Sequence, residues 1–195
     1  MGLKIEKIKT IFKNHLYSVQ YKGCNESEFS RLFKQWKNPE LVEVFLDTNK
    51  KELDNHFWKD RNMTQSKARR LITQEAIDTE DHFFDLYENT RKGDVPDFNQ
   101  EFFFLDKHVY QFSLRSKHKM YGTHEKEFPA FLRIYAIRID NNCFLITGGS
   151  IKLTQSMNES KYLIKELEKL NNVQSWLEKE YIADSDDLNK YENNE

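Results

Sequence analysis

The spacing of apolar and polar residues divides the first third of the chain into an extended segment followed by helices. Residues 16–22 alternate with period two, which predicts a short strand. The preceding segment, residues 4–12, fits either a strand or a helix. Residues 28–37 place apolar side chains at positions i, i+3, i+4 and i+7, which predicts a helix with one buried face.

The helical pattern continues to about residue 92. Asn38-Pro39 ends the first helix and suits the start of the next, because proline is favoured in the first helical turn. A third helix is predicted from Thr64, an N-cap candidate, to about Arg91, and Lys92-Gly93 is a natural stop. We therefore expect residues 28–92 to be mostly helical.

Strand-like patterns dominate the following segment. Residues 102–104 and 108–114 are aromatic and β-branched, and residues 131–147 fit two strands joined by a tight turn. Gly148-Gly149 then interrupts the pattern, as a bulge or as a place where the backbone approaches a phosphate. Residues 159–180 carry an apolar stripe at helical spacing, which predicts a final helix.

These elements indicate an α+β fold, with a small twisted, mostly antiparallel sheet packed by helices. Only 6 Gly and 3 Pro in 195 residues argue against a β-sandwich. We expect one domain over residues 1–182, with a helical insertion at about 38–92. Residues 183–195 are acidic and poor in apolar groups, which predicts a disordered tail.

Charge is distributed unevenly although the net charge is only -2. Residues 106–154 carry eight lysines and arginines against four acids, whereas residues 155–195 carry five lysines against ten acids. A local excess of positive charge attracts phosphate whatever the total charge. The basic segment is therefore a candidate polyanion-binding region, although such an excess also arises by chance.

Composition narrows the classes of protein. No apolar run approaches the roughly 20 residues that a membrane-spanning helix needs. The two cysteines, Cys24 and Cys143, are far apart and imply neither a zinc site nor a disulfide framework, so we expect a reduced, cytoplasmic location. The common nucleotide-binding, metalloprotease and hydrolase motifs are absent. Glu75 and Asp78 lie one helical turn apart, but such acids usually form a solvated face, and no metal or other cofactor is expected.

Basic and aromatic residues on the predicted strands are the remaining candidates for chemistry. Arg115 ends one strand, Arg133 and Tyr135 share a face of the next, and Lys152 follows the third. Arginine binds phosphate through a planar fork, lysine is a mobile charge, and tyrosine stacks on a base or donates a proton. Such a set suits RNA cleavage by the ribose 2′-hydroxyl. The same alternation is also typical of an ordinary solvent-facing strand.

The order of these elements resembles the RelE/HigB-type toxins of bacterial toxin–antitoxin systems. The segments that carry the resemblance are VYQFSLR (109–115), LRIYAIRI (132–139), FLITGGSIKLT (144–154) and the helix from Glu159. The chain departs from that family in its length and in its helical insertion. Lys152 is followed by Leu153, where the family usually has a second lysine.

The resemblance implies a metal-independent endoribonuclease that cleaves mRNA in the ribosome and is neutralised by an antitoxin, possibly of the helix-turn-helix type. The catalytic residues it implies are Arg115, Arg133, Tyr135 and Lys152. The implied RNA-binding residues are Lys117, His118, Lys119, Arg138 and Thr154.

Two alternatives remain open. The fold could serve as a non-catalytic protein-interaction module, because the helical block is rich in aromatic residues that could form an interface, for example in a homodimer. It could also inhibit gyrase in the manner of ParE-like members of the same superfamily, which would require no nuclease residues.

Overall fold

The computed structural model describes residues 3–91, 97–105, 115–123 and 128–193. It is an α+β fold built on a six-stranded sheet with the order β1-β2-β6-β5-β4-β3. β2 and β6 are parallel, and the other neighbouring strands are antiparallel. The strands are β1 (Ile5–Phe12), β2 (Leu16–Tyr21), β3 (Phe103–Phe104), β4 (Lys117–Tyr121), β5 (Leu132–Asp140) and β6 (Cys143–Ile151).

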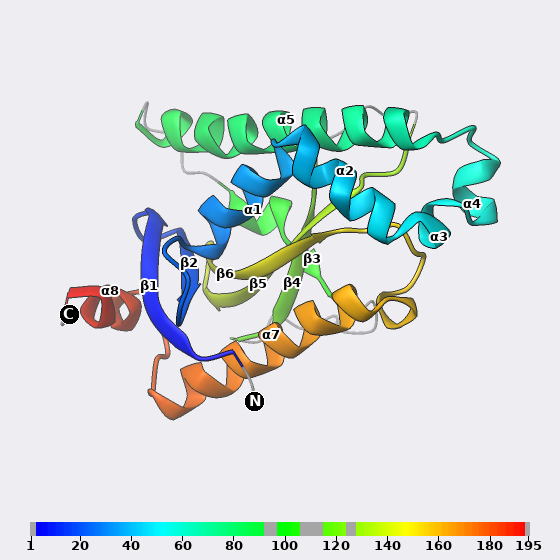
Figure 1. Cartoon of the computed structure of the whole chain (residues 1–195). Coiled ribbons are helices and arrows are strands. Elements are labelled where there is room, and N and C mark those ends of the chain that lie inside the picture. Colours follow the sequence, from blue (N-terminus) through cyan, green and yellow to red (C-terminus); the bar gives the residue numbers. More distant parts are fainter. Residues whose placement is uncertain (1–2, 92–96, 106–114, 124–127, 194–195) are drawn as a thin grey trace.

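Helices occupy both faces of this sheet (Figure 1). The first group lies on one face and consists of α1 (Glu28–Trp36), α2 (Pro39–Thr48), α3 (Lys50–Leu53), α4 (His56–Lys59) and α5 (Gln65–Arg91). The remaining helices are α6 (Phe98–Glu101), the 3-10 turn η1 (Met157–Glu159), α7 (Lys161–Lys179) and α8 (Ser185–Asn193). α7 covers the opposite face of β5 and β6, and α8 packs beside β1.

The helix boundaries follow from local capping. Ser27 accepts a hydrogen bond from the backbone of Ser30 at the start of α1, and Asn38 caps α2, whose first residue is Pro39. Thr64 accepts a hydrogen bond from the backbone N–H of Lys67 and caps α5. The helical block over residues 28–92 is therefore confirmed as far as Arg91, and the ambiguous N-terminal segment is a strand.

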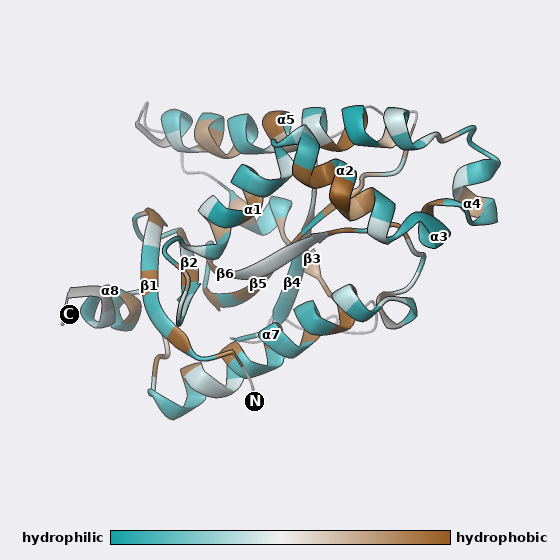
Figure 2. Cartoon of the chain, in the orientation of Figure 1, coloured by the Kyte–Doolittle hydropathy of each residue, from teal (hydrophilic) through white to brown (hydrophobic). Residues whose placement is uncertain are grey.

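Two apolar cores lie against the two faces of the sheet. Leu132, Ile134 and Ala136 of β5 belong to the core shared with α1, α2 and α5. Tyr135 and Ile137 point the other way, into the core shared with α7. Figure 2 shows that α5 and α7 each carry hydrophilic and hydrophobic residues, as expected of helices that pack on the sheet through one side. β5 is therefore buried on both faces rather than open to solvent on one.

Three predictions made from the sequence differ from the structure or lie outside the described residues. β6 continues as one strand through Gly148-Gly149, and the expected bulge lies directly before the glycines: Tyr135 pairs with Gly148 and Ala136 with Ile146, which leaves Thr147 as the extra residue of β6. The predicted disordered tail contains α8, because Leu188 is fully buried against the rest of the protein. The strand predicted over 108–114 lies outside the described residues.

Candidate functional site

Three of the four predicted catalytic residues, Arg115, Arg133 and Lys152, lie towards opposite ends of β5. The backbone N–H of Lys152 donates to the carbonyl of Phe131, so Lys152 lies near Arg133 at the start of the strand. The backbone N–H of Arg115 donates to the carbonyl of Arg138, near the far end. Five extended residues span roughly 16 Å. Arg115 therefore does not join Arg133 and Lys152 in one site.

Each of these side chains is held by other parts of the chain. Arg133 Nη1 donates to the carbonyls of Ala130 and Leu132 at 2.9 and 2.7 Å. Arg115 donates to the carbonyl of Ile182, and Lys152 Nζ donates to the carbonyl of Gln155.

Tyr135 requires a correction. Its side chain is only 1% exposed and belongs to the core beneath α7. This burial raises the pKa of its hydroxyl above the ordinary value. Tyr135 therefore cannot stack on a base in this structure, contrary to the role expected from the sequence.

Three of the predicted RNA-binding residues are also occupied within the fold. His118 is buried between the rings of Phe104 and Phe144, and this burial lowers its pKa. Arg138 donates to the carbonyl of Asp140 and to Asn141, and Thr154 donates to the carbonyl of Ser156. Arg138 and His118 are therefore inward-facing residues, which contradicts a direct role in binding RNA.

Lys117 and Lys119 lie instead on the outer part of the sheet, beyond α7. Residues on β4 alternate, so Lys117, Lys119 and Tyr121 share the face that also carries α7. Lys117 Nζ donates to Asn171 of α7 at 2.6 Å, and Lys119 Nζ donates to the carbonyl of Leu105 at 3.3 Å. Both lysines are only partly buried.

Two exposed aromatic rings accompany these lysines. Phe103 of β3 pairs with Lys119, is 53% exposed, and contacts the 39% exposed Tyr121 edge to face, with ring centroids 5.9 Å apart. The Arg133 guanidinium lies 4.1 Å from the centroid of the Tyr121 ring. We call Phe103, Lys117, Lys119 and Tyr121 the β4 patch. The period-two pattern of Lys117–Tyr121 could have placed Tyr121 on the same face as the two lysines. The pairing of Phe103 with Lys119 could not be predicted from the residues around Phe103.

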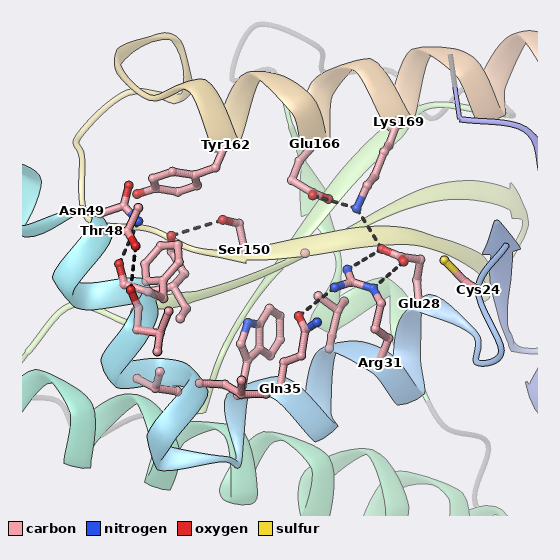
Figure 3. A pocket seen from close by; sticks show the side chains of 18 of the residues that line it. Cys24, Glu28, Arg31, Gln35, Thr48, Asn49, Ser150, Tyr162, Glu166 and Lys169 are labelled. Carbon is pink, nitrogen blue, oxygen red and sulfur yellow. Dashed lines mark hydrogen bonds and ion pairs between the residues drawn. The ribbon is translucent and has the colours of Figure 1, made fainter. Parts of the chain in front are cut away.

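A cavity of about 620 Å³ lies beside β6, away from the β4 patch. β2 pairs with β6 at only three positions, Leu16 to Ser18 opposite Phe144 to Ile146. Beyond these pairs, α1, α2, α7 and the second half of β6 enclose the cavity (Figure 3). Trp36, Val42 and Phe45 contribute much of its apolar wall.

Four charged side chains gather at one end of the cavity. Arg31 donates to both carboxyl oxygens of Glu28, at 2.7 and 2.8 Å. Lys169 of α7 lies 2.9 Å from Glu28 and 2.8 Å from Glu166. Figure 3 shows this chain of contacts from α1 to α7. We call Glu28, Arg31, Glu166 and Lys169 the charge cluster.

The two carboxylates of the charge cluster have opposite pKa shifts. Burial alone would raise the pKa of Glu28, but the hydrogen bonds and charges of Arg31 and Lys169 outweigh it and lower the pKa. Burial raises the pKa of Glu166 by more than Lys169 lowers it. Oε2 of Glu166 is buried and has no hydrogen-bond partner in the described part of the chain. Glu166 is thus the less satisfied carboxylate.

The charge cluster could not be predicted from the sequence, because each half has the spacing of an ordinary ion pair within a helix. Glu28–Arg31 and Glu166–Lys169 are both i,i+3 pairs, which are common on solvated helix faces. Only the packing of α1 and α7 at the same end of the cavity brings them together.

Other classes of site receive no support from the described residues. Among them, no group of His, Cys, Asp and Glu side chains is arranged to hold a metal ion. No helix in this part of the chain is long and apolar enough to cross a membrane. Comparisons with protein-family models, curated proteins and solved structures find no match.

Proposed function

We propose that the protein binds RNA through the β4 patch and acts as a toxin-like, metal-independent endoribonuclease on mRNA in the ribosome. The observation that carries this proposal is the pair of exposed rings, Phe103 and Tyr121, beside Lys117 and Lys119. Exposed aromatic rings with neighbouring cations suit single-stranded RNA, because bases stack on the rings while cations pair with phosphates.

The order of elements supports the same proposal. β2 is followed by helices, then by β4, β5 and β6, and finally by α7. The progression on which the resemblance to RelE/HigB-type toxins rests is similar, but it has its first of these strands at 109–115 in place of β4, and residues 109–114 lie outside the described part of the chain. By the same resemblance, a cognate antitoxin would cover the β4 patch.

The chemistry would differ from the assignment made from the sequence. Cleavage by the 2′-hydroxyl needs a proton acceptor, positive charge near the phosphorane and a proton donor. The exposed hydroxyl of Tyr121 and the partly buried ammonium of Lys119 are the groups of the β4 patch that would serve in these roles, and Arg133 behind Tyr121 adds positive charge. Lys152 would assist only if RNA extends to the loop after β6.

The test is expression from a tightly controlled promoter, with growth and mRNA cleavage by primer extension as readouts. We expect the wild-type protein to arrest growth and cut mRNA, and the double variant Lys119→Ala/Tyr121→Ala to do neither. The matched control, Lys165→Ala/Tyr181→Ala, removes the same side-chain types at exposed positions elsewhere and should behave as wild type.

The alternatives give different outcomes in this experiment. Growth arrest with intact mRNA would contradict the endoribonuclease and favour a ParE-like gyrase inhibitor. Normal growth with intact mRNA would favour a non-catalytic interaction module, which the burial of Tyr135 also favours. A stable homodimer in size-exclusion chromatography would further support the hypothesis of a non-catalytic interaction module.

A further inference from the structure

We propose that the protein forms a two-fold symmetric dimer in which one face of α5 packs antiparallel on the same face of a second copy. α5 belongs to the core on the side of the sheet opposite α7, whereas the β4 patch lies on the α7 side. The dimer therefore leaves the patch exposed, and the proposal does not depend on RNA binding. Such a dimer supports the non-catalytic interaction module only together with normal growth and intact mRNA.

α5 has an exposed face directly opposite the one that it buries. Figure 1 shows this helix beyond α1 and α2, on the side of the molecule away from α7. Ala68, Ile72 and Phe83 are buried in the core, and the positions on the opposite side of the helix, three or four residues apart, are exposed. We call these exposed positions the outer face of α5: Arg70, Gln74, Ile77, Asp81, Phe84 and Asp85.

The two parts of α5 carry opposite charge. Residues 65–70 contain three lysines and arginines and no acid, whereas residues 71–90 contain six acids and neither lysine nor arginine. On the outer face, Arg70 therefore lies at one end and Asp81 and Asp85 lie towards the other. Among the described residues, none of these three side chains forms an ion pair. Their charges are thus available to a partner.

This order of charges is unfavourable for a helix on its own. Acids stabilise the N-terminal end of a helix, because the unpaired N–H groups there carry partial positive charge. The first turn of α5 has Lys67 and no acid. Asp81 and Asp85 also lie at i,i+4 spacing, where like charges destabilise a helix. Cations from a partner beside these two carboxylates would relieve their repulsion.

A second copy of α5 in the antiparallel direction supplies those cations. Arg70, Ile77 and Phe84 are seven residues apart, which places them on one line along the helix. With the two-fold axis at Ile77, this residue meets its own counterpart, and Arg70 of each copy lies beside Phe84 and Asp85 of the other. The guanidinium then pairs with the carboxylate and stacks on a ring that is 49% exposed in the single chain. Both contacts occur twice, because a two-fold interface is self-complementary.

Charge exchange tests this arrangement, with sedimentation equilibrium of the full chain as the measurement. We expect a wild-type dimer, and a dimer Kd about tenfold higher or more for Arg70→Glu and for Asp85→Arg, because each change places like charges together at both ends of the interface. An equimolar mixture of the two variants should form a heterodimer, since opposite charges meet again at both ends. Lys165→Glu and Glu168→Arg make the same changes of charge on the exposed side of α7 and should dimerise as wild type.

Cross-linking tests the position of the two-fold axis. A short bismaleimide should link two copies of Ile77→Cys more efficiently than two copies of the wild type, because a residue on the axis meets its own counterpart. Val44→Cys, at an exposed apolar position on α2, should cross-link no better than wild type.

Four results would each overturn the proposal. They are a wild-type dimer that both charge variants leave unchanged, the absence of a heterodimer in the mixture, equal cross-linking of the two cysteine variants, and a wild-type monomer at every soluble concentration. The last result would leave a basic partner protein as the occupant of the outer face of α5.

Discussion

Glu75 shows how one buried carboxylate can connect two elements. It lies on α5, is 3% exposed, and accepts hydrogen bonds from the backbone N–H groups of Phe131 and Leu132, both at 2.8 Å. Burial raises its pKa to about 7, although these two bonds and the charge of Arg133 act in the opposite direction. Glu75 is therefore a helix-to-strand clamp rather than the solvated acid that its spacing to Asp78 indicated.

This clamp predicts a pH dependence of stability. The pKa of Glu75 is higher in the folded protein than its ordinary value of 4.5. Protonated Glu75 therefore contributes fully to the free energy of unfolding below about pH 4.5, and this contribution is lost as the pH rises through 7. The loss amounts to about 3 kcal/mol across this window. Urea unfolding at several pH values should show this decline in the wild-type protein and its absence in Glu75→Gln.

Glu75→Gln should also be less stable than wild type at low pH, because a glutamine can accept only one of the two backbone N–H bonds at its oxygen. The control is Glu178→Gln, at an exposed position on α7, which should keep the wild-type pH dependence. An identical pH profile for Glu75→Gln and wild type would show that another group titrates.

At the scale of elements, α8 shows what composition misses. Residues 183–195 are acidic, which predicts disorder, yet Leu188 is fully buried and Tyr191 packs edge to face on Trp176 of α7. The hydroxyl of Tyr17 in β2 also donates to Asn189 at 2.8 Å. A few contacts with the rest of the protein can therefore stabilise a short helix that its own sequence would not stabilise.

Removing that side chain should release α8. Leu188→Ala deletes buried methyl groups and is expected to destabilise the packing by about 2 to 4 kcal/mol. Amide hydrogen exchange should then accelerate over α8 while β5 and β6 stay protected. Tyr181→Ala is the control, because this ring is 86% exposed, and it should leave the exchange of α8 unchanged.

The same scale explains which elements could be predicted. α1, α5 and α7 have apolar residues at helical spacing, which is enough to predict them, and side-chain caps at Ser27 and Thr64 also mark the starts of α1 and α5. β3 has only two residues, and its existence depends on pairing with Lys119 and His118. β6 continues through two glycines because β5 pairs with it there, which a local pattern does not reveal.

At the scale of the whole molecule, the candidate sites depend on contacts between distant segments. Lys117 and Lys119 were predicted as RNA-binding residues from their charge and from the resemblance, whereas Tyr135 was misassigned because alternation cannot tell that α7 covers its side of β5. The charge cluster joins α1 to α7, which are separated by most of the chain. Sequence patterns thus propose candidate side chains, but they do not show which other elements bury or contact those side chains.

Salt dependence tests whether the β4 patch works as a polyanion site although the net charge is -2. The logarithm of RNA affinity should fall linearly with the logarithm of salt concentration, with a slope of about 0.7 for each phosphate contacted by single-stranded RNA. Lys119→Ala should reduce that slope by about 0.7, and Lys165→Ala should not. Fluorescence anisotropy with a labelled RNA measures both, and an unchanged slope for Lys119→Ala would place the phosphate contacts elsewhere.

The short parallel pairing of β2 with β6 also determines when the sheet can be completed during synthesis. Leu16, Tyr17 and Ser18 find their partners at Phe144, Leu145 and Ile146, about 130 residues later. At about 5 to 20 residues per second, the ribosome needs on the order of ten seconds to make that stretch. Throughout this interval the β1–β2 hairpin has an open edge with unpaired backbone groups, which is a template for aggregation. The nascent chain is therefore most in need of chaperone protection before β6 emerges.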